Sequence, residues 1–128
     1  MERSGAAGVM DDGRPIFQQI AELLESSILD GTLAEESQVP STNELAAFHR
    51  INPATAAKGV NKLVDDGTLY KKRGIGMFVS SGARAKLRVR RRDEFARQYV
   101  QPLVAEARKL GIDPAELKHM IDNWEETR

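Results

Sequence analysis

The chain has 128 residues and a formal net charge of zero, and it contains no cysteine. This length fits one ordinary domain or a small domain with an appendage and leaves little room for an enclosed active site. The missing thiols exclude disulfides and thiolate zinc sites, and the only histidines, His49 and His119, are too far apart for a metal-ligand motif. No signal-peptide pattern and no apolar run of about 20 residues is present. We therefore expect a cytoplasmic protein with no cofactor and no membrane partner.

Charge is unevenly distributed along the sequence. Residues 41–92 hold twelve basic and three acidic side chains, a balance of +9, whereas residues 1–40 balance at −6 and residues 93–128 at −3. Such asymmetry indicates a local surface that binds a polyanion. On charge alone, a solvated basic face explains the pattern equally well.

Residues 1–13 lack periodicity and are predicted to be disordered. Pro15 opens the first predicted helix at its first helical position, and Gly31 ends it. Apolar residues recur between them at i, i+3, i+4 spacing: Ile16, Phe17, Ile20, Leu23, Leu24, Ile28 and Leu29. Residues 32–40 are predicted to form a polar connection.

Two short helices joined by a tight turn follow. Ser41 and Glu44 form the capping box of the first helix, and Asn52 and Pro53 occupy the N-cap and first position of the second, which ends near Gly67. The residues expected to face inward are Leu45, Ala46 and Phe48 in the first helix and Val60, Leu63 and Val64 in the second, with Ala56 and Gly59 as small packing positions. This arrangement is a helix-turn-helix pattern.

The period changes after the second helix. Residues 68–72 and 77–80 are predicted strands around Arg73, Gly74, Ile75 and Gly76, which indicates a β-hairpin. A hairpin directly after a helix-turn-helix is the wing of a winged-helix domain.

A long helical pattern covers about residues 83–110, and Pro102 should kink or split it. Gly111 ends it, and Asp113 and Pro114 begin a last helix that extends to about Glu125. A helix of this length would measure ~42 Å, too long for the last helix to cover its apolar side chains within one chain. We expect a second copy to bury them through Phe95, Tyr99, Leu103, Leu117, Met120, Ile121 and Trp124.

Two alternatives remain open for this tail. It could fold back on its own first helix. Four of the same residues, Phe95, Tyr99, Met120 and Trp124, could instead line a pocket for a small-molecule effector.

A recognition helix presents its N-terminal half to base edges in the major groove. The candidates on the second helix are Asn52, Ala54, Thr55, Lys58, Asn61 and Lys62. Lys58 is the strongest candidate for a guanine contact, whereas Asn52 and Thr55 could be capping groups only. The wing supplies cations for phosphate and glycines for close approach: Lys71, Lys72, Arg73, Gly74 and Gly76.

A third basic feature begins the long helix: Arg84, Lys86, Arg88, Arg90, Arg91 and Arg92. These side chains could face a duplex, remain solvated or pair with the acidic first helix.

The segments GTL, VPSTNELA and INPATAAKGVNKLVDDGTLYKKRGIGMFV, in this order, resemble the GntR family of bacterial regulators from Pro15 to about Val79. The specific combination is Pro40-Ser41, Glu44-Leu45-Ala46, Leu63, Gly67 and Gly74-x-Gly76-x-Phe78-Val79. The start Asn52-Pro53-x-Thr55 and the short tail are similar to its YtrA-like subfamily. The resemblance implies a homodimer that binds an inverted-repeat operator in double-stranded DNA, with the C-terminal helices pairing the subunits.

The predicted DNA contacts also include Ser41, Thr42 and Asn43. The chain departs from the family at Asn43, where an Arg is usual, at Pro53 and Ala57, where basic residues are common, and at Glu36, where a loop glycine is frequent.

The sequence thus predicts a mostly helical fold with a small hairpin. A winged helix-turn-helix DNA-binding domain would cover residues 14–80 and a helical dimerisation region residues 83–128. The expected function is sequence-specific regulation of transcription, as a repressor; the alternative is a winged-helix module for protein–protein assembly. The sequence contains no Ser/His/Asp cluster, no set of metal ligands and no phosphate-binding loop, so we do not expect an enzyme.

Overall fold

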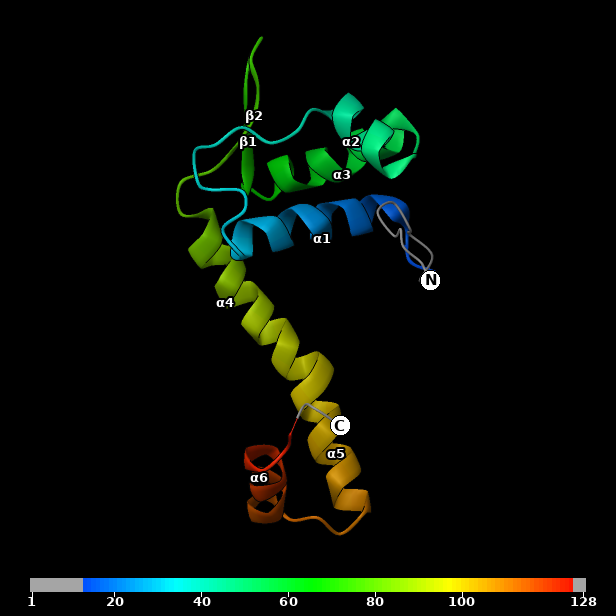
Figure 1. Ribbon diagram of the computed structural model, residues 1–128, viewed down its shortest axis with the longest axis vertical. Helices are drawn as coiled ribbons and strands as arrows, with labels where there is room; N and C mark the ends of the chain where they lie inside the picture. The colour runs from blue at the N-terminus through cyan, green and yellow to red at the C-terminus, as the bar shows by residue number, and fades with distance from the viewer. Residues whose placement is uncertain (1–12, 126–128) are drawn as a thin grey trace. The chain divides into compact units, whose positions relative to one another are not determined.

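The computed structural model describes residues 13–125, so the predicted disorder of residues 1–13 lies almost wholly outside the described residues. The elements are α1 (Ile16–Leu29), α2 (Thr42–His49), α3 (Pro53–Asp65), β1 (Leu69–Lys72), β2 (Gly76–Val79), α4 (Ala83–Phe95), the π-helical turn η1 (Ala96–Val100), α5 (Gln101–Lys109) and α6 (Pro114–Asp122) (Figure 1). The mostly helical fold with one antiparallel hairpin is confirmed. The chain divides into one compact unit up to Arg88 and a second from Val89.

Helix α1 provides one side of the first unit's core. Its residues Ile20, Leu24 and Ile28 are buried, whereas the predicted apolar positions Ile16 and Leu23 are partly exposed. Pro15 occupies the N-cap, one position earlier than predicted. The helix ends two residues before Gly31, as the sequence indicates.

Helices α2 and α3 begin at the predicted caps. The Ser41 Oγ accepts from the Glu44 amide at 3.0 Å while the Ser41 amide donates to Glu44 Oε1 at 2.8 Å. The Asn52 Oδ1 accepts from the Ala54 amide at 2.7 Å, and Pro53 follows as the first residue of α3. These bonds satisfy amides that the helix itself leaves without acceptors.

The prediction that Phe48 faces the core is wrong, because its side chain is 66% exposed. Helix α2 has only eight residues, and Leu45 and Ala46 make its buried contacts. Ile51, just after the helix, packs against the core and donates its amide to the Ala46 carbonyl at 3.0 Å. It takes the inward place that the sequence pattern assigned to Phe48.

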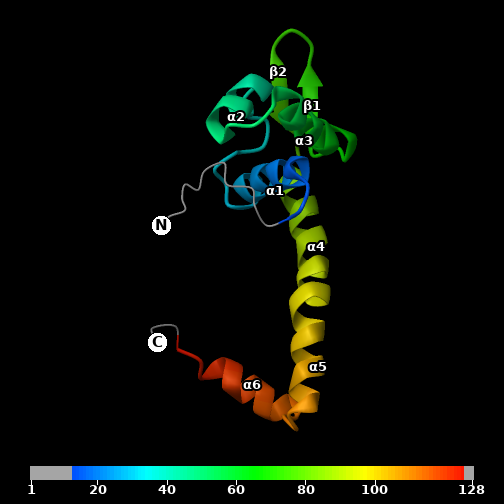
Figure 2. The ribbon, with the colours of Figure 1, turned by 90° about the vertical axis from the view of Figure 1, so that its right-hand side faces the viewer.

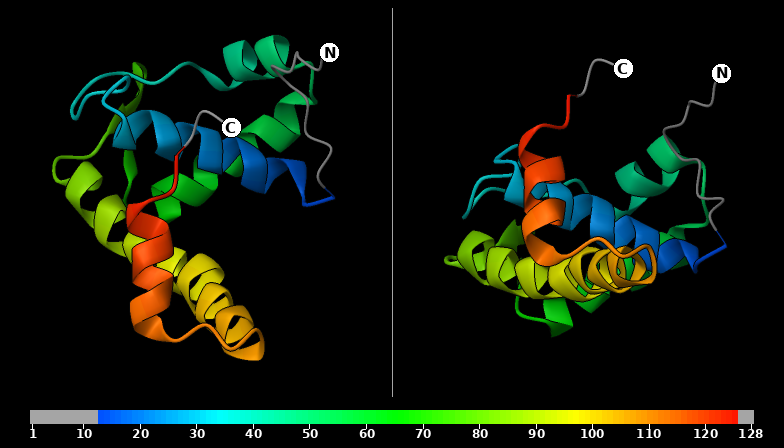
Figure 3. Two further views of the ribbon diagram at one scale, coloured as in Figure 1. Left: turned by 60° about the horizontal axis from the view of Figure 1, so that its bottom comes forward. Right: turned by 90° about the horizontal axis from the view of Figure 1, so that it is seen from below.

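Helices α1 and α3 lie against each other, as Figure 1 and the left view of Figure 3 show. The contact is close at Gly59, where a Cβ atom would stand 2.7 Å from the Phe17 carbonyl oxygen. Ala56, Val60 and Leu63 fill the interface beside it and are fully buried. A small residue at position 59 therefore sets how near the two helices approach.

The hairpin pairs Leu69 with Val79 and Lys72 with Gly76. Residues 36–39 add a third, short strand-like segment to β2, because the Val39 amide donates to the Met77 carbonyl at 2.9 Å and the Val79 amide to the Ser37 carbonyl at 3.0 Å. The prediction of a simple polar connection over residues 32–40 missed this pairing. The hairpin is consequently anchored along one edge.

The start of α4 belongs to the first unit. Ala83 and Leu87 are buried in the same core as α1 and α3. The helix then continues without interruption past the boundary between the units at Arg88.

In the second unit, the predicted effect of Pro102 takes the form of a π-helical turn. Proline lacks the amide proton for an i→i−4 bond, and its ring collides with the carbonyl of that residue. The Gln101 amide bonds to the Ala96 carbonyl, five residues back, and α5 starts at once. A single π-turn widens the helix just where the proline would clash.

The last helix is shorter than predicted. The Asp113 Oδ1 caps it by accepting from the Glu116 amide at 2.8 Å, and it ends at Asp122. Trp124 therefore lies beyond α6, not on its face, which corrects the predicted helix end near Glu125. Figure 2 shows α6 turned away from α5 after their connection.

Candidate nucleic-acid interface

The exposed face of α3 lies opposite the core. Ala54, Asn61 and Asp65 are exposed on it and Ala57 is half-buried, whereas the opposite face is buried. A shallow hollow of about 550 Å³ follows the exposed face and reaches Phe17 of α1. The small side chains of Ala54 and Ala57 leave room there for a partner to approach the helix backbone.

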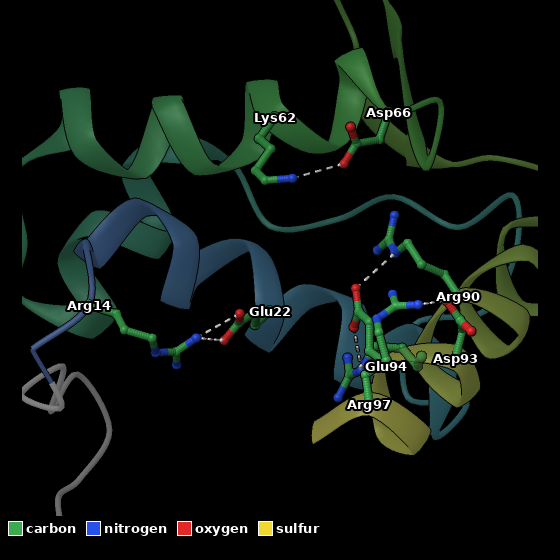
Figure 4. Close-up of polar contacts among 9 residues, drawn as sticks. Arg14, Glu22, Lys62, Asp66, Arg90, Asp93, Glu94 and Arg97 are labelled. Atoms are coloured by element: carbon green, nitrogen blue, oxygen red, sulfur yellow. Dashed lines mark hydrogen bonds and ion pairs between the residues drawn. The ribbon is translucent and has the colours of Figure 1, made fainter. Parts of the chain in front are cut away.

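The two lysines of α3 lie at the edge of this face. The Lys58 Nζ stands 4.2 Å from the centre of the Phe17 ring. The Lys62 Nζ lies 3.2 Å from the Asp66 carboxylate (Figure 4). Both ammonium groups thus have partners within the chain, and the one predicted to bind guanine sits on the α1 side of α3.

The cap positions carry structural duties. The Asn52 Oδ1 is occupied by the Ala54 amide, and the Ser41 Oγ by the Glu44 amide. Thr55 is half-buried, as is Thr42, whereas Asn43 is exposed at the start of α2. Of these five predicted contacts, Asn43 is therefore the one whose side chain is exposed and not used by a cap.

The wing tip is basic, exposed and held in shape from below. Lys71 and Arg73 are exposed, and the Lys72 Nζ lies 4.4 Å from the centre of the Phe78 ring. The Gln38 Nε2 donates to the Ile75 carbonyl at 3.0 Å. The segment before α2 thereby supports the turn that presents these cations.

Gly76 is required for this support. Its φ of +147° lies in a region that favours glycine, and an added Cβ would stand 2.5 Å from the Gln38 Nε2. Gly74 also has a positive φ and is exposed at the turn. Both wing glycines thus adopt backbone conformations that favour glycine, and their close approach to DNA stays a prediction.

The sequence analysis missed two residues beside these elements. Arg50 is exposed between α2 and α3 in a left-handed conformation, with φ of 56°. Ile75 is exposed at the wing tip. The sequence offered a signal for each: Arg50 is a basic residue in the turn of the helix-turn-helix, and Ile75 is an apolar residue between two wing glycines.

His49 lies next to Arg50, and burial lowers its pKa. Arg50 therefore supplies the positive charge of this turn at neutral pH.

The basic run of α4 is partly engaged within the chain. The Arg84 Nε donates to the Leu29 carbonyl at 3.0 Å, and Glu94 lies 3.9 Å from Arg90 and 4.0 Å from Arg91 (Figure 4). The helix also starts at the end of the hairpin opposite the tip, because β2 runs from Gly76 to Val79. These contacts favour internal pairing for the three arginines.

Apolar side chains remain uncovered in the second unit. Tyr99 is 62% and Trp124 73% exposed, and the Phe95 and Tyr99 rings pack together at 5.6 Å. Leu103, Met120 and Ile121 are also exposed, while Leu117 is half-buried. The predicted dimer contacts are therefore accessible in one chain.

Within residues 13–125 no group of three or more His, Asp or Glu side chains could hold a metal ion. No helix in this range combines the length and apolarity needed to cross a membrane.

The sequence model of the bacterial regulatory proteins of the gntR family matches residues 16–79. The chain belongs to the GntR family. It is accordingly a DNA-binding transcription regulator rather than an enzyme, and the resemblance identified from its motifs is confirmed. The matched residues are the ones that form α1, the helix-turn-helix and the wing.

Known members of the GntR family resemble this regulator over different lengths. The repressor YtrA of Bacillus subtilis is 27% identical over 84% of this chain and 82% of its own. A GntR-family regulator from Bacteroides thetaiotaomicron is 33% identical, with a TM-score of 0.71 over 83% of this chain and 92% of that one. The DNA-binding domain of AraR, solved with operator ORX1, is 29% identical, with a TM-score of 0.52 over 56% of this chain and 87% of that one.

Proposed function

We propose that this GntR-family regulator is a sequence-specific repressor that binds an inverted-repeat operator as a homodimer in the cytoplasm. The observation that carries the proposal is the presence, in one compact unit, of an open α3 face and a braced basic wing tip. YtrA, which is similar to this chain over most of both lengths, is named a repressor, and the structure of the AraR DNA-binding domain was solved in complex with an operator. A dimer bound across a promoter would exclude polymerase.

We assign base contacts to the open face of α3. Ala54 and Ala57 let the helix approach the groove floor, where a methyl group can meet a thymine methyl, and Asn61 can pair with adenine. The N-terminus of α3 adds its partial positive charge toward phosphate. Asn43 and Arg50 extend this contact toward the backbone.

Lys58 and Lys62 are better suited to phosphate than to bases. The Lys58 ammonium lies over Phe17 of α1, and the Lys62 ammonium lies beside Asp66 at the end of α3. A phosphate contact needs only a nearby positive charge, whereas a guanine contact needs directed donors. This assignment revises the guanine contact expected for Lys58.

The wing is proposed to hold the sugar-phosphate backbone at the adjacent minor groove. Lys71, Lys72 and Arg73 are its exposed cations, and Ile75 is an exposed apolar residue at the tip. Glycines on both sides of Ile75 leave the tip narrow. These contacts would add affinity with little sequence preference.

The second unit is proposed to pair two chains. Its exposed residues Phe95, Tyr99 and Leu103 are four apart and lie before, within and after the π-turn. Burying each against a partner would contribute on the order of 2 kcal/mol before the cost of association. A twofold pair would then present two α3 helices about one DNA turn, ~34 Å, apart.

The test is selection of bound duplexes from a random pool with the full chain. We expect enrichment of an inverted repeat by the wild type. Arg73→Ala should weaken binding to every duplex while selecting the same repeat, and the tail substitution Lys118→Ala is the matched control for loss of one charge. Failure to enrich any sequence would contradict the proposal and favour the protein-assembly module.

A further inference from the structure

The loop after α1 carries a carboxylate that caps a distant helix. The Glu35 Oε1 accepts from the Gly82 amide at 2.9 Å, and its Oε2 accepts from the Arg84 amide at 3.1 Å. Those amides are at the start of α4, 47 and 49 residues further along the chain. A helix start leaves such amides without partners, and a carboxylate there also meets the positive end of the helix dipole.

The same helix start is fixed at two more points. The Arg84 Nε donates to the carbonyl of Leu29, the last residue of α1, at 3.0 Å. Ala83 and Leu87 are buried in the core of the DNA-binding unit. The first turns of α4 are therefore attached to the loop, to α1 and to the core.

The charge state of Glu35 suits this role. The amide bonds from Gly82 and Arg84 lower the pKa of the Glu35 carboxyl, and the Arg84 charge adds to the effect. The group is ionised at neutral pH and offers both oxygens as acceptors. A glutamine in its place would keep one such acceptor and bring a donor to the other amide.

Without these contacts, α4 would be joined to the hairpin only through residues 80–82. Gly82, with a φ of +82°, is the last of them. Such a short connection can swing when nothing holds the helix that follows it. The bonds from Glu35 and Arg84, which together we call the clamp, hold the first turn of α4 and fix the direction in which this helix begins.

On the basis of the proposed homodimer, we propose that Glu35 is a positioning residue that fixes the direction in which α4 leaves the DNA-binding unit and thereby sets the half-site spacing the dimer accepts. One added base pair moves a half-site by ~3.4 Å and rotates it by a tenth of a turn. A stiff connection rejects such a change, and a loose one tolerates it. The carboxylate acts on DNA recognition without touching DNA.

The test compares Glu35→Ala with the wild type on duplexes whose two selected half-sites are moved apart or together by one, two and three base pairs. We expect the wild type to prefer one spacing sharply. Glu35→Ala should reduce the ratio of affinities for the best spacing and the next by at least about fivefold, with Glu35→Gln in between.

The matched control is Glu36→Gln. It removes the neighbouring charge, but its amide oxygen can still accept from the Tyr70 hydroxyl, which lies 2.6 Å from Glu36 Oε1. Its spacing preference should equal that of the wild type. A variant that is merely less folded would lose affinity for all spacings equally and keep the ratio.

Amide hydrogen exchange gives a readout that does not need DNA. The Gly82 and Arg84 amides should exchange at least about tenfold faster in Glu35→Ala than in Glu36→Gln. An unchanged spacing ratio or unchanged exchange in Glu35→Ala would overturn the role of Glu35. A wild type that binds no duplex, or binds all spacings alike, would instead overturn the proposed dimeric function.

Discussion

Replacing Gly59 by alanine should destabilise the DNA-binding unit, although alanine favours helix formation. Gly59 lies inside α3 where that helix meets α1. An alanine Cβ would stand 2.7 Å from the Phe17 carbonyl oxygen and 3.1 Å from the Ile20 Cβ. The nearest of these atoms is backbone, so relief requires a shift of α1 by several tenths of an ångström.

Two opposing contributions decide the size of the effect. Alanine in place of glycine inside a helix gains about 1 kcal/mol. Overpacking a close interface costs about 1–3 kcal/mol. We expect a net loss of about 1 kcal/mol, which for a unit of this size lowers Tm by about 4–8 °C.

The assay is urea and thermal unfolding of Gly59→Ala beside the wild type. Ala57→Gly is the control, because it measures the propensity contribution within the same helix and should destabilise by about 1 kcal/mol. A Gly59→Ala protein that is more stable than the wild type would refute the close contact between α1 and α3.

Three further predictions concern the wing, the tail and the loop. Arg73→Ala should reduce the slope of log affinity against log salt by about one, measured by titration on one duplex, because one phosphate contact is lost; an unchanged slope would exclude Arg73 from the interface. Tyr99→Ala should weaken dimer formation by at least about tenfold in analytical ultracentrifugation, since its side chain is 62% exposed in one chain and would be buried by the partner; an unchanged association constant would remove it from the proposed contact. The pKa of Glu35 is lowered from 4.5 in the folded chain, so the stability it contributes is present above pH 4.5 and lost as pH falls through the lowered pKa. The urea midpoints of wild type and Glu35→Ala should therefore converge as the pH falls. A difference between the two midpoints that stays the same at every pH would contradict the capping of α4 by the Glu35 carboxylate.

Elements defined by local chemistry could be predicted from the sequence. The capping box of Ser41 and Glu44, the Asn52–Pro53 start and the Asp113 cap each act over three residues or fewer, and the structure forms all three. The hairpin followed from a change of period and from its glycines. These signals also placed the DNA-binding elements in the right order.

Features that depend on distant neighbours could not be predicted in this way. Phe48 is exposed, and Ile51 after α2 packs against the core instead. The cap on α4 comes from Glu35, 47 residues before the first amide it binds. Whether Lys58 points at DNA or at Phe17 depends on the packing of α1 against α3, which no local pattern contains.

Position 36 holds a glutamate where the resemblance to the GntR family leads us to expect a loop glycine, and the structure shows how the chain accommodates it. Glu36 adopts a φ of +67°, a conformation that is uncommon for residues other than glycine. Its carboxylate accepts from the Tyr70 hydroxyl at 2.6 Å, and its amide donates to the Val79 carbonyl at 2.8 Å. Two bonds to the hairpin thus hold a backbone conformation that the side chain disfavours.

The most direct test of the account is the mass of the complex formed on one selected duplex, measured by native mass spectrometry across a salt titration. Two α3 helices joined through the tail predict two chains per duplex, with affinity that falls steeply as salt rises. A single chain per duplex, or binding that does not respond to salt, would contradict the claim that paired winged helices hold the DNA.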